Sequence, residues 1–272
     1  MKRIAVLMSV YKKDRLEYFR QSVESILGQT YGDVMLIVGV DGRVDDELRS
    51  YLICLERDGQ TLVRWFEENR GLACVLNDLI EECRKQGIEY YARMDADDIA
   101  MPDRLEKQLV FLKENKDVDV VGGAIEEIDE NGEKLGKTVC YPLTNEGCRR
   151  YFRYHDPVAH PSVLFRARFF EKVKDGYRNE YRRNQDTMLW FDGIKSGCVF
   201  ANLPDTVLKY RVTDNYYIDR LGNWTLAKKK LKDRLKINRD LHFGLPSYLF
   251  AIALFCTTAL PKWLKRFLHK RR

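Results

Sequence analysis

The sequence predicts an α/β protein whose mostly parallel sheet is covered by helices on both faces. Apolar runs without a polar break, as expected of strands buried on both sides, alternate with stretches of helical period. Within the first hundred residues this alternation forms two successive β-α-β units. With 45% hydrophobic and 32% charged residues among 272, the chain has the composition of a globular protein.

The first half of the chain contains four predicted strands. They cover residues 4–8, 34–40, 61–66 and 90–94. Helices are predicted after the first and third strands, with apolar faces formed by Leu16, Phe19, Val23, Ile26 and Leu27, and by Leu72, Leu76, Leu79, Ile80 and Cys83. Because ligands gather at the carboxyl ends of parallel strands, residues 40–42 and 94–98 are candidate ligand-bearing ends.

The second half is predicted to contain shorter and more varied elements. Asn131-Gly132 is a turn signal that predicts a hairpin within residues 125–154. The remaining expected elements are a helix over 103–115, strands over 118–123, 160–166 and 207–211, a helix opened by residues 184–186, a basic helix over 225–241 and an uncharged run over 241–260.

Charge and cysteine content narrow the functional classes. The net charge is +6 from 47 basic and 41 acidic residues, which is too balanced for a protein that coats nucleic acid, so no nucleic-acid partner is expected. The basic excess is confined to residues 228–240 and 261–272. The seven scattered cysteines form no CxxC pair and no zinc spacing, which indicates reduced thiols in a cytoplasmic protein.

Asp95-Ala96-Asp97-Asp98 places three carboxylates within four residues, directly after a predicted buried strand. Crowded negative charges are costly unless a cation neutralises them, so this motif predicts a hard divalent metal such as Mg²⁺ or Mn²⁺. The alternative is an acidic turn that caps the next helix. The position at the carboxyl end of a strand favours the metal.

Several motifs in this order and spacing resemble the family 2 glycosyltransferases over roughly residues 3–215. They are Ser9-Val10-Tyr11, Ser25-Ile26-Leu27 with Gln29-Thr30-Tyr31, Val40-Asp41-Gly42, Asn69-Arg70-Gly71-Leu72 with Leu76-Asn77, and Asp95-Ala96-Asp97-Asp98 with Pro102-Asp103-Arg104-Leu105. The resemblance implies a Rossmann-like GT-A domain over residues 1–215, with a C-terminal helical extension over 216–272. It also implies inverting transfer of a sugar from a nucleotide-diphosphate donor, usually UDP-linked, in bacterial surface-polysaccharide synthesis.

The resemblance also assigns donor-binding residues. Val10 and Tyr11 would begin the loop against the uracil, and Asp41 would contact the nucleoside unless it is only a turn residue before Gly42. The other donor-binding residues implied are Asn69, Arg70, Gly71, Asp95, Ala96 and Arg211, of which Arg70 and Arg211 have the alternative of being ordinary surface charges.

For the metal, the resemblance makes Asp97 the ligand beneath the diphosphate, with Asp95 at the ribose or the metal. His160 has a possible metal or acceptor role, although a lone histidine is more often a hydrogen-bonded structural residue. Asp98 is expected to cap the following helix, and Arg104 is expected to brace the acidic loop or to be purely structural.

An inverting transfer needs a base that removes the proton of the acceptor hydroxyl. In this family an Asp after a Glu at a helix start supplies it, and here the pair is Gln185-Asp186. Gln185 removes a neighbouring charge that would raise the pKa of Asp186, so we expect a weaker or differently tuned base. The alternative role for Asp186 is a helix N-cap.

The C-terminal segment is expected to contact a membrane. The run over residues 245–260 is short of the ~20 residues that a spanning helix needs. Residues 261–272 place Trp263, Leu264, Phe267 and Leu268 on one helical face among basic residues, as in a helix that lies on an anionic leaflet. This predicts a peripheral protein at the inner face of the plasma membrane. The resemblance to the family implies a glycan or polyprenyl-diphosphate-linked acceptor, which agrees with that location. The alternatives are a packing helix or a dimer contact.

Two other functions compete with the transferase. A haloacid-dehalogenase-type phosphotransferase also uses paired aspartates, but it places them on the first strand. A GT-A-fold scaffold without catalysis would explain Gln185, although the acids at 95, 97 and 186 are retained.

Overall fold

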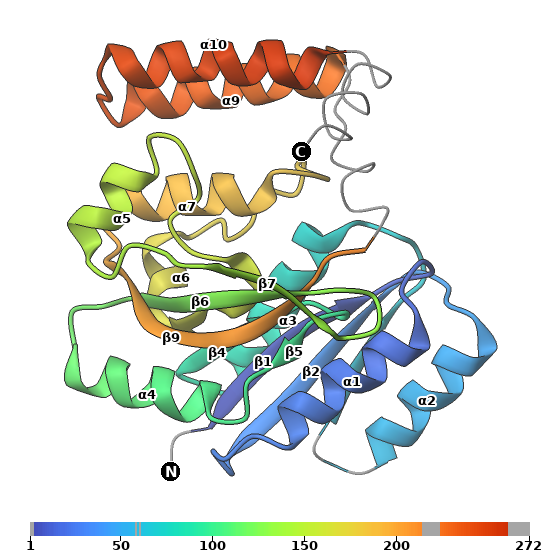
Figure 1. Ribbon diagram of the computed structural model, residues 1–272. Coiled ribbons are helices and arrows are strands. Elements are labelled where there is room, and N and C mark those ends of the chain that lie inside the picture. The colour runs from blue at the N-terminus through green and yellow to red at the C-terminus, as the bar shows by residue number, and fades with distance from the viewer. Residues whose placement is uncertain (1–2, 58, 60, 214–223, 261–272) are drawn as a thin grey trace.

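A computed structural model describes residues 3–57, 59, 61–213 and 224–260 of the chain. Figure 1 shows a twisted sheet with helices on both faces and, at the top, two helices side by side. The described strands form a nine-stranded sheet in the order β3-β2-β1-β4-β8-β6-β9-β5, with β7 paired to β6. The predicted α/β architecture is confirmed.

The N-terminal half of the sheet is parallel. β1 pairs with β2 and β4, and β2 pairs with β3. These strands are β1 (Ile4–Val10), β2 (Val34–Asp41), β3 (Thr61–Phe66) and β4 (Tyr90–Met94). Since the strands are parallel, the carboxyl ends of β1, β2 and β4 lie at one edge of the sheet.

The second half is mixed. β8 (Leu164–Arg166) runs antiparallel to β4 and to β6 (Val120–Ile128), and β5 (Ile99–Ala100) runs antiparallel to β9. The hairpin predicted from Asn131-Gly132 is confirmed, because β6 pairs with β7 (Lys134–Val139) across a turn in which Gly132 has φ 88°.

The last strand is longer than its sequence indicates. β9 (Phe200–Arg211) begins seven residues before the expected start at residue 207 and runs parallel to β6. Pro204 and Asp205 break the apolar pattern in its middle. The pairing register with β6 shifts near Ala124, so the strand passes the interruption as an irregularity and continues.

Helices cover the two faces of the sheet and complete two hydrophobic clusters. In β1, Ile4, Val6 and Met8 face one cluster and Ala5 and Leu7 face the other. On the first face lie α1 (Leu16–Leu27), α2 (Asp46–Arg57) and α4 (Arg104–Glu114). On the second lie α3 (Leu72–Lys85), α5 (Asn145–Tyr151), α6 (Arg168–Lys172) and α7 (Gln185–Lys195), with the 3₁₀ turn η1 (His160–Ser162) at its border.

The two helices at the top of Figure 1 are α9 (Trp224–Asp240) and α10 (Leu245–Ala259). The contacts that attach α9 to the body include two short hydrogen bonds: Arg234 donates to the carbonyl of Phe152 at 2.9 Å, and the hydroxyl of Tyr181 donates to Asp233 at 2.7 Å. Among the described helices, none combines the length and the apolarity needed to cross a bilayer. The amphipathic segment predicted over residues 261–272 lies outside the described residues.

Candidate active site

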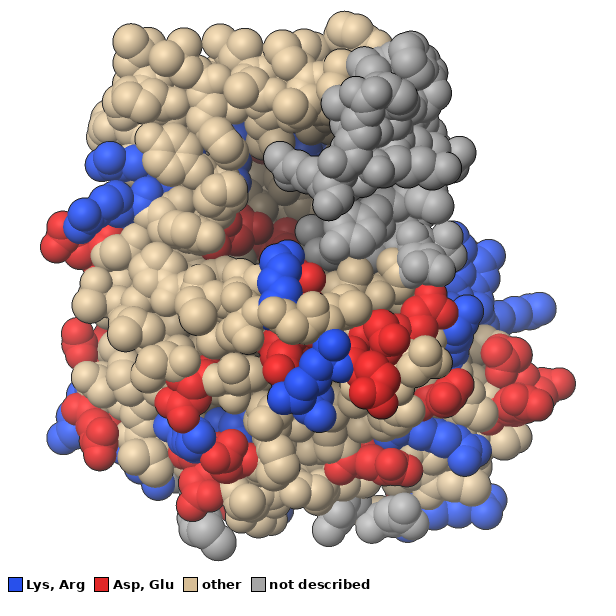
Figure 2. Space-filling model, in the orientation of Figure 1, with Lys and Arg blue, Asp and Glu red and all other residues tan. Residues whose placement is uncertain are grey.

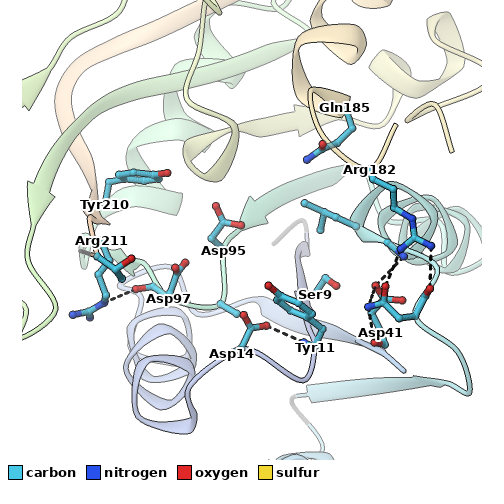
Figure 3. Close-up of a pocket in the computed structure, with 15 residues that line it drawn as sticks. Ser9, Tyr11, Asp14, Asp41, Asp95, Asp97, Arg182, Gln185, Tyr210 and Arg211 are labelled. Carbon is cyan, nitrogen blue, oxygen red and sulfur yellow. Dashed lines mark hydrogen bonds between the residues drawn. The ribbon is translucent and has the colours of Figure 1, made fainter. Parts of the chain in front are cut away.

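A cavity of about 450 Å³ opens where β1, β2 and β4 end (Figure 3). Asp95 projects into its middle, with Asp97, Tyr210 and Arg211 on one side and Asp41 and Arg182 on the other. The cavity thus gathers the two strand ends that the sequence marked as candidates. The predicted donor-binding residues that line it are Tyr11, Asp41, Asn69, Gly71, Asp95, Ala96 and Arg211.

Two of the predicted donor-binding side chains, Val10 and Arg70, do not line the cavity. Val10 is fully buried in the core, because it is the last inward-facing residue of β1. Arg70 turns away from the cavity, pairs with Asp78 and lies 4.4 Å from the centre of the Phe66 ring. For Arg70 the surface-charge alternative describes the side chain, and only its backbone takes part in the site.

Asp41 organises the loop that forms one wall. Its carboxylate accepts hydrogen bonds from the Asn69 amide at 2.9 Å and from the backbone N–H groups of Arg70 at 2.7 Å and Gly71 at 2.9 Å. Arg182 holds the same loop from the other side, donating to the Asn69 side chain at 2.8 Å. Asp41 is therefore more than a turn residue, because it ties the end of β2 to the start of α3.

The acidic motif is compact. Oxygen atoms of Asp95, Asp97 and Asp98 lie within 4.8 Å of one another. Burial, and then the charge of Asp95, raise the pKa of Asp97 to about 6. Burial and the charges of both neighbours raise the pKa of Asp98 well above its usual range. These shifts show that the described chain leaves the carboxylates under-neutralised.

Asp98 does not cap a helix as expected. Its carboxylate accepts a hydrogen bond from the backbone N–H of Arg211 at 2.9 Å, and α4 begins only at Arg104. The second oxygen of Asp98 is buried without a hydrogen-bond partner. The physical reason is the short strand β5, which separates the acidic loop from the helix and directs Asp98 toward β9.

Arg211 braces the acidic loop. Its guanidinium donates to the backbone carbonyls of Asp97, Asp129 and Glu130 and to the side chain of Gln21, at 2.6 to 3.1 Å. These bonds give Arg211 a structural role, although it lines the cavity. Arg104 is also structural: it is fully buried and donates to the carbonyl of Arg93 at 2.8 Å.

Ser22 of α1 and the motif residue Gln29, just after α1, hold the acidic loop and the chain that follows it. Ser22 donates to the carbonyl of Asp95 at 2.8 Å. Gln29 donates to the carbonyl of Met101 at 2.8 Å and accepts from the N–H of Leu105 at 3.0 Å. This explains why a Gln after the first helix belongs to the signature: it fixes the chain that follows the carboxylates.

A second cavity of about 490 Å³ adjoins the first. The two share Leu72, Asp95, Gln185 and Tyr210, while Asp186 lines only the second. Gln185 is drawn above Asp95 at the edge of the first cavity (Figure 3), and its side-chain oxygen is buried without a hydrogen-bond partner among the described residues. Of the predicted metal acids, Asp97 lines only the first cavity and Asp95 lines both, whereas the predicted base Asp186 lines only the second.

Thr187 links Asp186 to a second carboxylate, Asp156, which was not predicted from the sequence. Thr187 donates its N–H to Asp186 at 2.8 Å and its hydroxyl to Asp156 at 2.9 Å. Burial raises the pKa of Asp186. Burial, and then the charge of Asp186, raise the pKa of Asp156 to about 7. The N-cap position belongs to Asn184, so the capping alternative for Asp186 is wrong.

The possible metal role of His160 is not borne out. His160 is absent from the ligand group formed by the described acids. Its Nε2 lies 2.7 Å from the hydroxyl of Tyr177, and its ring packs edge-on against Trp190. Burial, and then the charge of Arg93, lower its pKa well below the usual range. His160 lines the second cavity as a neutral, hydrogen-bonded side chain.

Sequence reasoning missed six charged residues of the two cavities, of which Glu127 and Lys137 line the second. Asp14 lines the first, where burial and the charges of Asp97 and Asp95 raise its pKa to about 8 although the N–H of Tyr11 binds it. Arg93 is buried and pairs with Asp95. Arg182 and Asp156 complete the set. Only Arg93 carried a signal, since an arginine in an otherwise apolar buried strand needs an acidic partner.

Comparisons with known proteins agree with this geometry. A family model described as glycosyl transferase family 2 matches residues 5–174. An O-antigen biosynthesis glycosyltransferase of Escherichia coli is 31% identical over 92% of this chain and 96% of its own length. An amylovoran biosynthesis glycosyltransferase of Erwinia amylovora is 28% identical over 98% of both chains.

Two further proteins are similar over nearly the whole chain. A UDP-Gal:alpha-D-GlcNAc-diphosphoundecaprenol beta-1,3-galactosyltransferase of Escherichia coli is 26% identical over 99% of this chain and 96% of its own. The crystal structure of S. aureus TarS with UDP-GlcNAc superposes with a TM-score of 0.62, covering 95% of this chain and 82% of that chain at 15% identity. At that identity the likeness shows the GT-A fold alone. Together with the match over more than half its length, these relatives show that the chain belongs to glycosyl transferase family 2.

Proposed function

We propose that this glycosyltransferase moves a sugar, with inversion, from a UDP-sugar to a hydroxyl of a glycan or lipid-linked acceptor in surface-polysaccharide synthesis. The observation that supports this most is the shared wall between the two cavities. The first cavity would hold the nucleotide diphosphate near Asp95 and Asp97, and the second would hold the acceptor near Asp186. Displacement with inversion needs the leaving group and the base on opposite faces of the sugar.

Asp95 and Asp97 are suited to hold Mg²⁺ or Mn²⁺. Their oxygens cluster with those of Asp98, burial and then repulsion from Asp95 raise the pKa of Asp97, and hard cations prefer carboxylate oxygens. A bound metal would stabilise the charge that develops on the departing diphosphate. Arg182, which is exposed beside Asn69, is placed to approach the same diphosphate.

Asp186 would act as the base. Its carboxylate takes the proton of the acceptor hydroxyl as that oxygen attacks the anomeric carbon, and the bond from this carbon to the diphosphate oxygen breaks. Gln185, between the cavities, would orient the transferred sugar through its amide. Asp156 replaces the negative charge that a Glu at position 185 would have provided next to Asp186.

A relative whose name specifies a diphosphoundecaprenol substrate supports a polyprenyl-diphosphate-linked acceptor. Such an acceptor resides in a membrane, so we place the protein in the cytoplasm at the inner face of the plasma membrane. The basic, amphipathic sequence of residues 261–272 would assist this association.

The test is a panel of UDP-, GDP- and dTDP-sugars, each with and without Mn²⁺, monitored by thermal shift and nucleotide release. We expect metal-dependent stabilisation by UDP-sugars. Asp186→Asn should retain this binding but lose at least a hundred-fold in turnover, because the base is gone. The matched control is Asp175→Asn, an exposed acid that precedes the same helix. Near-normal turnover by Asp186→Asn would refute the assigned base.

Gln185 favours a second candidate, a GT-A-fold protein that binds nucleotide sugars without transferring them. This candidate predicts donor binding by the wild type with no nucleotide release under any condition. Restoring the family residue with Gln185→Glu separates the two, because only a silenced enzyme would gain activity.

A further inference from the structure

The outer face of α10 is apolar and exposed. The helix contains no charged residue over its 15 positions. Leu245, Leu249 and Ile252 are 70%, 59% and 52% exposed, and Cys256 follows on the same face at helical spacing. Figure 2 shows the top of the molecule, where α10 lies, free of Lys, Arg, Asp and Glu on the visible side. A contiguous exposed apolar surface of this kind marks an interaction site.

Basic residues flank this apolar face. The neighbouring helix α9 exposes Trp224, Lys228, Lys232 and Arg239, which recur at helical spacing. The Trp224 ring packs against Phe255 of α10 at 5.5 Å, so the two exposed surfaces adjoin. In the sequence, residues 261–272 add six Lys or Arg and no acid directly after α10.

We propose that the exposed face of α10 inserts into the surface of an anionic bilayer, with the basic face of α9 on the headgroups. This proposal rests on the lipid-linked acceptor of the proposed function and names the surface that reaches it. At 1.5 Å per residue α10 is about 22 Å long, too short to span the ~30 Å core, but suited to lie in the interface.

Charge distinguishes a bilayer from a second copy of the chain as the occupant of this face. Two copies that met through α10 would bring their Lys228, Lys232 and Arg239 side chains close together, and these would repel. Anionic headgroups would neutralise the same charges. The apolar face with a basic border is therefore complementary to an anionic lipid surface.

The opposite side of α10 leads to the second cavity. Phe250 packs against Tyr154 and His155 with ring centroids 5.2 and 5.7 Å apart, and His155 lines that cavity. The distance from the bilayer to the proposed acceptor site would then be the diameter of one helix, about 10–12 Å. An acceptor sugar could enter the cavity while its lipid stayed in the membrane.

The test is sedimentation of the full-length protein, without substrate, with vesicles of phosphatidylcholine alone or mixed with phosphatidylglycerol. We expect binding to the mixed vesicles. Leu249→Ser with Ile252→Ser should lower the partition coefficient about ten-fold or more, because both side chains lose their apolar insertion. The matched control is Val110→Ser with Leu135→Ser, which alters two similarly exposed apolar residues away from α10. Lys228→Gln with Lys232→Gln should weaken binding only to the mixed vesicles.

Unchanged binding by the α10 variant, or no binding of the wild type to either vesicle, would overturn the proposal. A contact between copies would give a different result. The wild type would then be a dimer by light scattering and would bind no vesicles, and the α10 variant would be a monomer. UDP-sugar hydrolysis is measured separately in solution. It should be equal in the α10 variant and the wild type, and its absence from both would refute the proposed function without affecting the vesicle result.

Discussion

The proposed chemistry depends mainly on a few acidic side chains. The repulsion between their carboxylates can be measured through its effects on stability and activity. Asp14, Asp95, Asp97 and Asp98 come from two loops and meet at one cavity edge. Their arrangement is unfavourable in the free protein and becomes favourable when a cation or a cationic group joins them. Substitution of one acid should therefore have opposite effects on activity and on stability.

For Asp97→Asn we expect turnover of the donor to fall about 100- to 1000-fold, as for other groups that stabilise developing charge. The midpoint of thermal denaturation without metal should rise, because one member of a repelling group is neutral. The control is Asp117→Asn, an exposed acid before β6 that is not part of the acidic motif. Retained turnover with retained metal dependence would exclude Asp97 as a ligand.

The Asp156–Asp186 pair predicts a pH effect. The pKa of Asp156 is raised to about 7, partly by the charge of Asp186, so Asp186 loses its proton first as the pH rises. Ionisation of Asp156 near pH 7 then strengthens Asp186 as a base. Asp156→Asn should abolish the rise in kcat near pH 7 and keep the rise at lower pH.

The measurement is the pH dependence of kcat, with Glu114→Gln as the control because Glu114 is an exposed acid at the end of α4. An Asp156→Asn profile that matches the wild type would show that the two carboxylates do not interact in the enzyme. A merely structural role for Asp156 would lower kcat equally at all pH values.

At the scale of elements, the start of α3 shows how a glycine shapes the donor cavity. Gly71 has φ 91°, and an added Cβ would lie 2.9 Å from the Arg182 side chain. Gly87, just after α3, has φ 65° with no atom within 4 Å of its added Cβ. Both positions disfavour an L-residue, but only Gly71 also contacts the site.

We expect Gly71→Ala and Gly87→Ala each to lower the free energy of unfolding by about 1 kcal/mol through backbone strain. Only Gly71→Ala should also weaken UDP binding, several-fold or more, because Arg182 and the loop held by Asp41 must move. Calorimetric titration with UDP and denaturant unfolding measure the two effects. Equal UDP affinity in both variants would show that the Gly71–Arg182 contact does not shape the donor site.

The elements were predictable from the sequence where burial makes a simple pattern. β1, β2 and β4 are covered on both faces and give unbroken apolar runs, and the first cavity opens at their ends, where ligand-bearing residues were expected. β9 was only partly predicted, because Pro204-Asp205 interrupts a strand whose continuity depends on pairing with β6. Local pattern holds no information about such a distant partner.

The residues of the site were also predictable only in part, and those that directly follow buried strands were the ones found. Asp41, Asp95 and Asp97 follow strands directly, so topology alone brings them together. Asp14, Asp156 and Arg182 lie in loops whose positions depend on long-range contacts, as when Asn77 of α3 holds the chain at Tyr177 through two hydrogen bonds of 2.7 and 2.8 Å. Residues of this kind become visible only when the chain is folded.

At the scale of the whole molecule, the proposed membrane-binding helices and the two cavities lie in an order that would bring a membrane-bound acceptor to the donor. The helices α9 and α10 rest on the side of the body that bears α7, and α7 begins with Gln185 and Asp186, which both line the second cavity. The first cavity, proposed to hold the donor, adjoins the second and lies at the end of the parallel strands. An acceptor held at the bilayer would therefore meet the donor at Gln185 and Asp95.

The stability of the whole protein without metal should fall as the pH rises from about 6.5 to 8. The pKa of Asp14 in the folded chain is about 8 and that of Asp156 about 7, whereas an unfolded carboxyl has a pKa of about 4. The folded state therefore binds more protons than the unfolded state in this range, and stability is lost as they dissociate. We expect a loss of about 1–2 kcal/mol from Asp14.

The range is chosen so that other groups do not mask this loss. Burial lowers the pKa of His155 and His160, so these two residues make stability rise with pH below pH 6.5. Burial raises the pKa of three cysteine thiols, which affects stability only above pH 8; they are Cys83, Cys148 and Cys198. Thermal denaturation at several pH values, with and without Mn²⁺, is the measurement. Mn²⁺ should stabilise the protein more at pH 8 than at pH 6.5, because metal and protons compete for the same carboxylates. Asp14→Asn should make the metal-free curve less steep and leave the part that Asp156 contributes. A curve that is flat in the wild type would show that the pKa of Asp14 is not raised in the folded protein.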